Sequence, residues 1–407
     1  MFTLTIAWRN LWRNKRRTIL TCSAIAFATV LIQLGMSFQV GSYGPMIEGA
    51  TRFGSGHLQI QHQDYKDEPK LERTIPNSKD IITNLANISD ITAVAPRSES
   101  FALLNNEEKS YGAMIIGVKA TAESEVSYLP KNISEGAYLP TSDSAYTGTT
   151  LAKNLGIKLG DEIVLLSHDN LGGIAASVPI LTGIFTSGND QLDRSLVQIP
   201  LETFNDVFQL DNDVHRIVIM VENPLDLDAT KKAIERILPP STRVYDWREL
   251  MPEISQNIRL DKISNGIIYG TLTIIVVLSI ANTFVMSIFE RTREFGTLRA
   301  LGMKNFALFR LFLTESIILW LLGVSIGLTV TILGNVPLAH YGIALSSLGV
   351  DQFAGQFYLP DRLHPHIDIN VLLVAPLALG VGICTTSMFA TARMYRISLI
   401  KALRFKE

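Results

Sequence analysis

Few residues in this chain have the types and spacing that chemistry requires. His364-Pro365-His366 and Asp368 carry imidazole and carboxylate groups, which are common zinc ligands in proteins. The run contains a proline and lies directly before an apolar segment, which is typical of a loop that leads into a helix. We therefore predict no metal site there.

Catalytic motifs give no better candidate. The sequence has no Gly-x-x-x-x-Gly-Lys-[Ser/Thr] phosphate loop, no His-Glu-x-x-His and no Cys-x-x-Cys. The two cysteines, Cys22 and Cys384, both fall within apolar segments, so the polar part of the chain has no disulfide framework. We predict that the chain has no catalytic residues and is not an enzyme.

A mixed-charge stretch, residues 282–303, is more informative. It begins with apolar residues, continues through the charged run 290–294 and ends near Gly302. This pattern predicts a membrane helix that continues as a charged helix and stops at a glycine. Because acidic residues lie among the arginines, we favour a specific docking surface for a partner protein over a basic loop that only fixes topology.

The segments on either side of this stretch, which must position it, are predicted membrane spans. Only 18% of the 407 residues are charged, and four long windows contain no Asp, Glu, Lys or Arg. A helix needs about 20 apolar residues to cross the hydrocarbon layer, where its backbone must bond internally. We take the first window as a retained helix and not a cleaved signal peptide, because its apolar core is long. The predicted transmembrane helices are 18–40, 266–289, 312–336 and 369–392.

Basic residues set the predicted orientation. Fifteen lysines and arginines flank the spans on one side, against three glutamates, whereas residues 42–262 carry 20 basic and 31 acidic residues, a net charge of −11. Short cytoplasmic segments are rich in basic residues. Both termini, the loop 290–311 and the tail 393–407 are therefore expected in the cytoplasm, and residues 41–264 and the loop 337–368 outside.

The first 17 residues, 1–17, predict an amphipathic helix. Trp8, Leu11 and Trp12 lie at i, i+3 and i+4 on one face, and arginines occupy another face. A helix of this kind lies in the plane of the membrane interface. We expect it on the cytoplasmic side, ahead of the first span.

Residues 41–264 have the mixed polar and apolar composition of a globular domain. Leu58 and Ile60 alternate with polar residues, which predicts a half-buried strand, and helical patterns lie between further strand-like runs. We predict an α+β domain in two lobes, with a strand-rich second lobe at about 136–200. The predicted fold class is thus an α-helical membrane protein with four transmembrane helices and a large two-lobed α+β extracytoplasmic domain inserted between the first two.

The stretch 282–303 closely resembles the corresponding segment of the MacB/FtsX-like ABC transporter permeases, a family that includes the lipoprotein-releasing LolC/LolE group. The layout resembles that family over the whole chain, and it is most like the lipoprotein-releasing permeases. Ile397-Ser398 departs from the Asp-Pro that is usual near the C-terminus in the family. The positions that match the family's motif are Asn282, Met286, Ser287, Glu290, Arg291, Arg293, Glu294, Gly296, Arg299, Ala300 and Gly302.

The resemblance implies a mechanism and a set of partners in a bacterial inner membrane. Two permease subunits, identical or related, would pair above two copies of a separate cytoplasmic ATPase, which would bind ATP and Mg²⁺ and hydrolyse the ATP. ATP binding would bias a two-state element and transmit motion to the outer domains. The permease itself would need no cofactor and no nucleic acid. Residues expected to couple the ATPase to the spans are Glu290, Arg291, Arg293, Glu294, Leu298, Arg299, Leu301 and Gly302.

Three functions are consistent with this resemblance. The first is extraction of lipoproteins or other amphiphiles from the outer leaflet, with a periplasmic carrier; the run 183–188 followed by Asp190 and Asp193 resembles a run in the lipoprotein-releasing permeases. The second is efflux of peptides or small toxic compounds with a periplasmic adaptor. The third is signalling to a periplasmic partner such as a cell-wall hydrolase.

For the first function we expect a lipid-accepting groove at the outer halves of the first two spans. Met and aromatic side chains give an adaptable apolar surface. Core packing is the alternative role for each groove residue taken singly. The expected groove residues are Gln33, Met36, Phe38, Ile268 and Tyr269.

Overall fold

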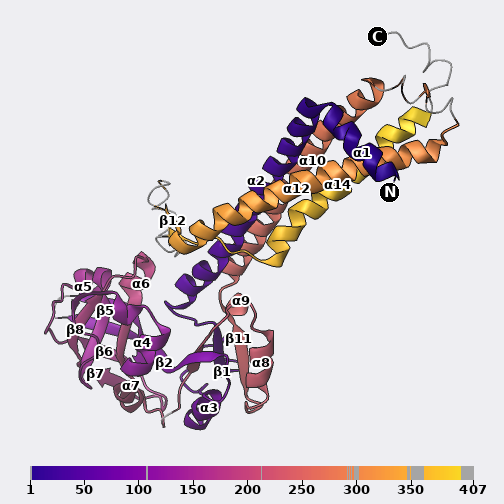
Figure 1. Cartoon of the computed structure of the whole chain (residues 1–407). Helices are drawn as coiled ribbons and strands as arrows, with labels where there is room; N and C mark the ends of the chain where they lie inside the picture. Colours follow the sequence, from indigo (N-terminus) through magenta and orange to yellow (C-terminus); the bar gives the residue numbers. More distant parts are fainter. Residues whose placement is uncertain are drawn as a thin grey trace. The chain divides into compact units, whose positions relative to one another are not determined.

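The computed structural model describes residues 2–106, 109–211, 213–290, 292, 294, 296–297, 302–345, 349 and 362–395. They divide into two compact units (Figure 1). The helical unit comprises the described residues within 1–43, 258–348 and 361–407, and the α/β unit comprises those within 44–257 and 349–360.

Long helices build the helical unit. They are α1 (Phe2–Arg13), α2 (Lys15–Thr51), α10 (Pro252–Glu290), α12 (Asn305–Tyr341) and α14 (Ile369–Tyr395). Among the described residues, four helical segments are long and apolar enough to cross a membrane, namely Lys15–Thr51, Pro252–Glu290, Phe306–Tyr341 and Ile369–Thr391. Two short strands, β12 (Ile343–Ala344) and β13 (Arg362–Leu363), pair antiparallel. The α/β unit follows α2 and precedes α10 in the chain, which confirms the predicted fold class.

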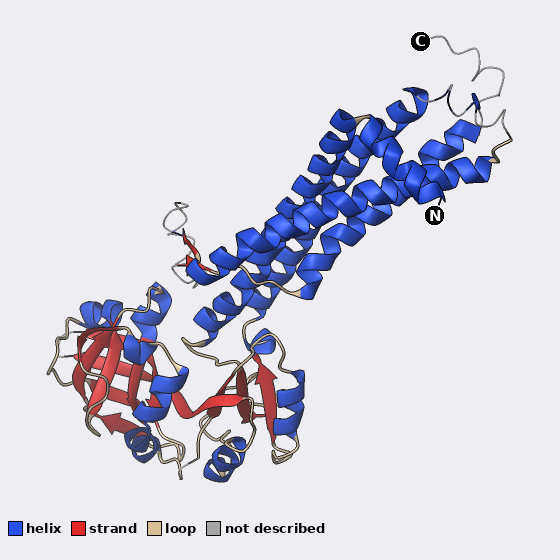
Figure 2. Ribbon diagram, in the orientation of Figure 1, coloured by secondary structure: helices blue, strands red, loops and turns tan. Residues whose placement is uncertain are grey.

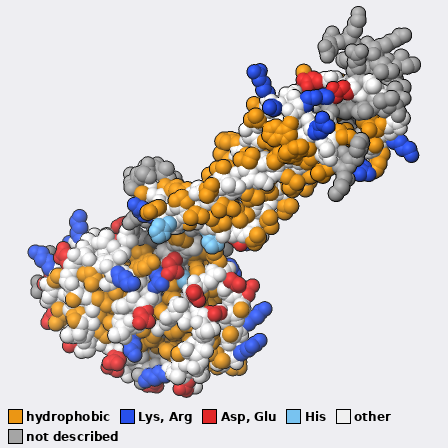
Figure 3. Space-filling model, viewed as in Figure 1, with side chains coloured by type: hydrophobic (Ala, Val, Ile, Leu, Met, Phe, Trp, Pro, Cys, Tyr) orange, Lys and Arg blue, Asp and Glu red, His pale blue; other side chains and the backbone are white. Residues whose placement is uncertain are grey.

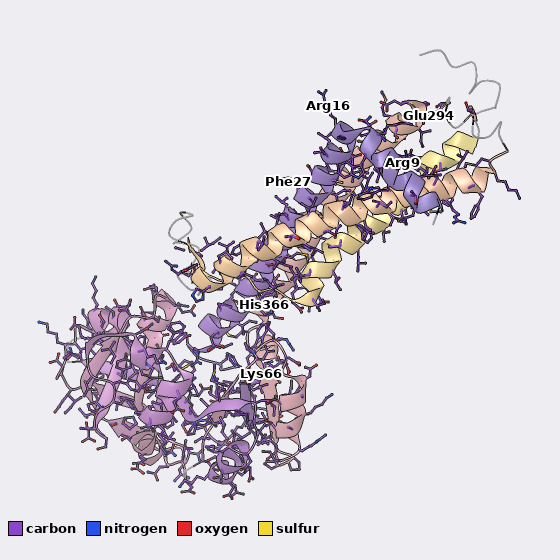
Figure 4. All side chains as sticks on the ribbon, viewed as in Figure 1. Arg9, Arg16, Phe27, Lys66, Glu294 and His366 are labelled. Atoms are coloured by element: carbon purple, nitrogen blue, oxygen red, sulfur yellow. The ribbon has the colours of Figure 1, made fainter. Side chains whose placement is uncertain are left out.

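Apolar side chains face both the inside and the outside of the helical unit. Ile25, Phe284 and Phe312 belong to its buried core, whereas Phe27 and Phe389 are exposed. Figure 3 shows apolar side chains over the visible face of this unit, and Figure 4 labels Phe27 on the outer side of α2. An apolar outer surface of this extent is what a helix bundle presents to lipid.

The seam between α2 and α12 is closed by small residues. A Cβ atom built on Gly323 would lie 2.7 Å from Ile25 Cβ, and one built on Gly327 would lie 2.7 Å from Thr29 Cβ. Asn335 Nδ2 donates a hydrogen bond to Ser37 Oγ (3.1 Å) further along the same seam. Small residues let helices approach closely in lipid, where no hydrophobic force drives them together.

The residues 323–327 also match the Gly-x-Ser-x-Gly pattern of serine hydrolases. In those enzymes the serine sits on a strained turn between a strand and a helix. Here the run lies in the middle of α12, and its two glycines pack against α2. The pattern therefore reflects helix packing and is no nucleophile site.

The α/β unit contains most of the strands. These are β1 (Leu58–His62), β2 (Ile91–Asn106), β3 (Lys109–Val118), β4 (Ile133–Gly136), β5 (Ser144–Gly148), β6 (Val164–His168), β7 (Ile174–Ser177), β8 (Ile180–Phe185), β9 (Leu196–Pro200), β10 (Arg216–Val221) and β11 (Thr242–Asp246). Its helices are α3 (Ser78–Leu85), α4 (Ala120–Val126), the 3₁₀ helix η1 (Leu129–Lys131), α5 (Thr149–Leu155), α6 (Asp190–Ser195), α7 (Leu201–Phe208), α8 (Asp228–Glu235) and α9 (Trp247–Leu250).

One sheet runs through both lobes of this unit, in the order β11-β1-β10-β2-β3-β9-β5-β8-β4, with β6 on β2 and β7 on β6. The long strand β2 joins the lobes, because residues 91–97 pair with β10 whereas residues 103–105 pair with β6. Figure 2 shows the two groups of strands and the strand that connects them. The second lobe packs around a core that includes Phe204 and Phe208.

The prediction that β1 is half-buried was wrong. Gln59 and Gln61 are as buried as Leu58 and Ile60. Their burial follows from the position of β1 inside the sheet, between β10 and β11. Gln61 Nε2 donates to Gln59 Oε1, so the two amides partly satisfy each other.

Candidate functional site

A cavity of about 550 Å³ lies between α2, α10 and α14 in the helical unit. This volume falls within the range of about 300–1,000 Å³ that is usual for small-molecule sites. The lining is mainly apolar. It consists of Ile32, Met36, Gln39, Val40, Tyr43, Lys262, Gly266, Tyr269, Gly270, Thr273, Ile274, Val374, Ala375 and Ala378.

Missing side chains on α10 create the space. Gly266 and Gly270 are four residues apart, so they share one face of the helix. Apart from the adjacent residues and the backbone of α10 itself, no heavy atom lies within 4 Å of a Cβ built on either residue. One turn beyond the lining, a Cβ built on Gly382 would lie 2.3 Å from Val277 Cγ2, so α14 and α10 come together there and close the cavity at that end.

A polar cluster lies at the other end of the cavity. Asp261 Oδ2 accepts hydrogen bonds from Tyr43 Oη (2.7 Å) and Gln39 Nε2 (3.1 Å), both on α2. Asp261 Oδ1 accepts a third bond from Asn265 Nδ2 (2.8 Å). Lys262 Nζ lies 5.2 Å from the centre of the Tyr43 ring, a cation–π distance. The cavity thus combines an apolar interior with a charged and hydrogen-bonded mouth.

The structure brings together two of the five expected groove residues. Met36 and Tyr269 line the cavity, and the Tyr269 ring packs on Gly35, where a built Cβ would lie 2.9 Å from the tyrosine hydroxyl. Phe38 and Ile268 are outside the lining, and Ile268 is exposed on the surface of α10.

Gln33 faces away from the cavity and has a structural partner. Its side chain is fully buried, and its Nε2 donates to the backbone carbonyl of Leu372 on α14 (2.8 Å). In a regular helix that carbonyl would accept from residue 376, which here is Pro376 and has no N–H. Gln33 therefore replaces the hydrogen bond that the proline removes, as backbone groups inside a membrane require.

Sequence reasoning missed most of the mouth. Asp261 and Lys262 lie just before a charge-free window. In the sequence they were counted only in the net charge of residues 42–262. Two signals could have found the cavity: the four-residue spacing of Gly266 and Gly270, and the Tyr43 and Gln39 side chains on one face of the first helix.

The opposite end of the bundle carries ion pairs that join α1 and α2 to the last residue of α10 and to Glu294, which follows it. Arg13 Nη2 lies 2.5 Å from Glu294 Oε1, and Arg17 Nη1 lies 3.4 Å from Glu290 Oε2. Figure 4 labels Arg9, Arg16 and Glu294 at this end and His366 at the other. These pairs connect the N-terminal helix to the predicted coupling segment.

Only part of that coupling segment is described. Glu290, Glu294 and Gly302 are within the described residues, and Gly302 has φ +94°, a left-handed conformation that favours glycine. The other predicted coupling residues lie outside the described residues. These are Arg291, Arg293, Leu298, Arg299 and Leu301.

Helix α1 packs against the bundle through one side. Leu11 is buried in the bundle core, and Asn10 Nδ2 donates to Glu315 Oε1 on α12 (2.7 Å). Trp8 and Trp12 are exposed and pack edge to face, with ring centres 5.8 Å apart. The predicted apolar face is thus divided, with Leu11 inside and both tryptophans outside, where such rings suit a membrane interface.

A second cavity, of about 340 Å³, lies at the junction of the two lobes of the α/β unit and includes Arg97 in its wall. Arg97 Nη2 and Nε donate to the buried Glu123 carboxylate (2.7 and 2.9 Å). Glu99 accepts from the Tyr65 hydroxyl (2.7 Å) and pairs with Arg216. Since these charges compensate each other, the cluster serves to hold the lobes together.

A histidine completes this junction. His215 Nδ1 accepts a hydrogen bond from the Glu99 backbone N–H (3.0 Å), and its ring stacks on Tyr65. Burial lowers the pKa of His215, and burial also raises the pKa of the Tyr65 hydroxyl. Both groups are therefore neutral at pH 7 and act as hydrogen-bonding packing groups.

The run 183–188 with Asp193 also has a structural explanation. Asp193 is buried, and its Oδ1 accepts from the backbone N–H (2.8 Å) and hydroxyl (2.6 Å) of Ser187. Gly148 packs on the Asp193 backbone. This carboxylate fixes the turn between β8 and α6.

Two family models match the sequence. The MacB-like periplasmic core domain model matches residues 18–237, more than half of the chain, and the FtsX-like permease C-terminal model matches residues 266–399. The chain belongs to the MacB/FtsX-like family of ABC transporter permeases. The predicted family is thereby confirmed, and the chain is a multi-pass permease subunit of an ABC transporter.

Similar proteins of known name include both lipoprotein-releasing and export systems. The lipoprotein-releasing system transmembrane protein LolC of Neisseria meningitidis is 22% identical over 430 residues, which cover 100% of both chains. LolE of Haemophilus influenzae is 22% identical, covering 92% of this permease and 93% of that protein. The pyoverdine export ATP-binding/permease protein PvdT of Pseudomonas fluorescens is 24% identical, covering 86% of this permease but 54% of that protein.

A solved structure is also similar to part of this chain. The crystal structure of the periplasmic region of MacB from Actinobacillus actinomycetemcomitans aligns with 53% of this permease and 97% of that chain, at 15% identity and a TM-score of 0.39.

Proposed function

We propose that this permease extracts lipoproteins or other amphiphiles from the outer leaflet of a bacterial inner membrane, driven by a separate ATPase. The observation that carries the proposal is the cavity between α2, α10 and α14, which is apolar inside and polar at its mouth. A molecule with an acyl chain and a polar head matches both parts. A route for a hydrophilic solute would instead need polar groups along the lining.

The orientation that follows from charge puts this cavity in the outer half of the membrane. Its mouth residues Tyr43 and Lys262 lie at the end of the bundle opposite to Arg13 and Arg17. Basic residues mark the cytoplasmic side of membrane proteins. Both termini and the 290–311 loop are therefore cytoplasmic, and the α/β unit is periplasmic.

One copy of the ATPase binds at the 290–302 segment of each of two permease subunits, and the ATP and Mg²⁺ reside in those two ATPase copies. The pairs Arg13–Glu294 and Arg17–Glu290 support this assignment, because they link the segment to α1 and α2. Movement imposed by ATP binding at the segment then reaches α2, which forms one wall of the cavity. A second copy of this chain, or a related permease, completes the transporter.

An exposed apolar surface on the α/β unit fits a periplasmic carrier or adaptor. Strand β7 pairs with β6 alone among the described strands, so one of its edges is open. Phe101, Leu171 and Ile174 on or beside this hairpin are 68%, 80% and 77% exposed. Exposed apolar residues beside an open strand edge favour docking of another protein.

The alternative function is adaptor-dependent efflux of peptides or small toxic compounds. Relatives named for pyoverdine and macrolide export favour it. The second alternative, signalling to a cell-wall hydrolase, would leave the cavity without a ligand. The three functions therefore differ in what the cavity holds and in what the periplasmic unit binds.

Affinity purification from a mild detergent extract tests the proposal, with proteins and lipids identified by mass spectrometry. We expect an ATPase, a second permease subunit and a bound acylated molecule. The variant Gly270→Leu should lose the acylated molecule, because the new side chain enters the cavity, and should keep the ATPase. Gly334→Leu is the matched control, since it also adds a leucine at an open helical glycine but lies outside the cavity.

The coupling assignment is tested separately. Arg299→Glu should abolish stimulation of the ATPase by the permease while the protein stays in the membrane.

In the affinity purification, recovery of a periplasmic adaptor without any acylated molecule would support the efflux alternative. Absence of an ATPase would contradict both transport functions and the assignment of the coupling segment.

A further inference from the structure

The mouth of the cavity contains one cation that forms no ion pair within the described part of the chain. Lys262 lines the cavity and contributes the only charged side chain among its lining residues. No ion pair with Lys262 occurs among the described residues. The ammonium group lies over the Tyr43 ring at 5.2 Å, a contact that holds a cation in place and leaves its N–H groups free to donate.

The neighbouring carboxylate is engaged elsewhere. Asp261 directs Oδ2 to Tyr43 (2.7 Å) and Gln39 (3.1 Å) and Oδ1 to Asn265 (2.8 Å). These three neutral donors stabilise the carboxylate, and the two on α2, Tyr43 and Gln39, tie α10 to that helix. Asp261 therefore builds the mouth, and the Lys262 ammonium remains available to a ligand.

We propose that the cavity selects an anionic amphiphile, with one acyl chain in the apolar interior and a phosphate or carboxylate head bound to Lys262 Nζ. This inference rests on the proposed function and names the substrate class of the same site. A lysine suits the task because its ammonium is a compact charge on a flexible apolar stem, which can lie along the apolar wall. An amphiphile with an uncharged head would leave this cation without a partner.

A nearby arginine provides a control that distinguishes selective binding at the cavity from general attraction to an anionic membrane. Arg259 lies three residues before Lys262 on α10. Both side chains are exposed, but only Lys262 is part of the lining. An anionic membrane surface attracts every basic residue near it. If the preference for anionic lipids came from that attraction, both cations would contribute equally; binding at the cavity depends on Lys262 alone.

Native mass spectrometry of the purified full-length chain tests the inference. The chain is equilibrated with phosphatidylglycerol and phosphatidylcholine of identical acyl chains, and the retained lipid is counted. We expect phosphatidylglycerol to be retained up to about fivefold more, in line with one ion pair at an exposed mouth. Lys262→Met should remove the preference, Lys262→Arg should keep most of it, and Arg259→Met should leave it unchanged.

A second arm tests whether the site requires both an acyl chain and an anionic head. An alkyl phosphate and a fatty acid of equal chain length compete for the retained lipid, and inorganic phosphate is the control without a chain. Competition by either amphiphile and none by inorganic phosphate is the expected result. Competition by inorganic phosphate at equal concentration would contradict a site that needs both chain and head.

The outcomes also distinguish this inference from the proposed function. An equal loss of preference in Lys262→Met and Arg259→Met, or no preference in the wild-type chain, overturns the inference. The proposed function would then still stand if Gly270→Leu blocks uptake of an acylated molecule. Loss of preference in Lys262→Met alone supports the inference even where no ATPase co-purifies, because lipid retention needs no ATP.

Discussion

Helix α2 makes two very different seams within the helical unit. Toward α12, Gly323 and Gly327 bring the backbones together, and Asn335 bonds Ser37. Toward α10, the Tyr269 ring rests on Gly35, and beside that contact a cavity of about 550 Å³ opens. Both seams contain glycines at four-residue spacing, on α12 in the first and on α10 in the second.

The difference shows that glycines at four-residue spacing do not by themselves indicate whether two helices pack closely. In lipid, small residues allow close approach but do not enforce it. On α12 the neighbour supplies Ile25 and Thr29 to fill the grooves, whereas on α10 no atom lies near Gly266 or Gly270. We infer that the closed seam provides stability and that the open seam provides binding, so substitutions in the two seams should have different effects.

The largest loss of stability is expected in the closed seam. Gly327→Leu forces a side chain against Thr29 and the Ala26 carbonyl, and the backbone carbonyl cannot move aside. Overpacking of this kind costs about 3 kcal/mol. Thermal unfolding in detergent, followed by fluorescence-detected size exclusion, should show it. Gly334→Leu on the same helix is the control, and equal unfolding temperatures for the two variants would contradict the account.

The next effect concerns the amide that replaces a missing backbone bond. Gln33→Met leaves the Leu372 carbonyl unpaired in the bundle, which should cost about 1–2 kcal/mol. Pro376→Ala restores the N–H group that the proline lacks. The cost of Gln33→Met should therefore disappear in the Pro376→Ala background. An unchanged cost in the double variant would mean that Gln33 acts by another route.

A smaller effect is expected at the mouth of the open seam. Tyr43→Phe removes one of three donors to Asp261, and Asp261 keeps the other two. The cost of one such hydrogen bond is about 0.5–1 kcal/mol. The same thermal assay measures this cost. A loss of stability as large as that of Gly327→Leu would show that the mouth also contributes strongly to the stability of the fold.

The smallest change in stability is expected where the change in binding is largest. Gly270→Leu fills open space and replaces a poor helix former, so the chain should be unchanged or stabilised by up to about 1 kcal/mol. Bound amphiphile should be lost at the same time. Destabilisation by Gly270→Leu would indicate that the cavity closes in the membrane.

The fold could be predicted from the sequence because its signals are long and local. Charge-free windows identified the spans, although α10 already begins at Pro252, well before residue 266, since helical hydrogen bonding continues past the apolar segment. The burial of β1 could not be predicted, because it depends on the two strands that pair with it.

The site could be predicted only in part for the same reason. Met36 and Tyr269 were found from residue type and depth along the spans. Gln33 was wrongly assigned to the groove. Its partner is the Leu372 carbonyl, which Pro376 leaves free on another helix, and the sequence alone does not show that contact. Lys262 was missed because, in the sequence alone, a binding lysine beside an apolar window cannot be distinguished from a basic residue that only flanks a membrane span.

The central claim is that the cavity between α2, α10 and α14 receives the acylated substrate. Site-specific photocrosslinking in the assembled transporter tests it most directly, with the crosslinker at Met36 in the cavity or at the exposed Leu333 on α12. The account predicts a defined acylated adduct at Met36 that disappears in the Gly270→Leu background, and only bulk phospholipid at Leu333. The same mixture of bulk lipid at both positions, unaffected by Gly270→Leu, would contradict it.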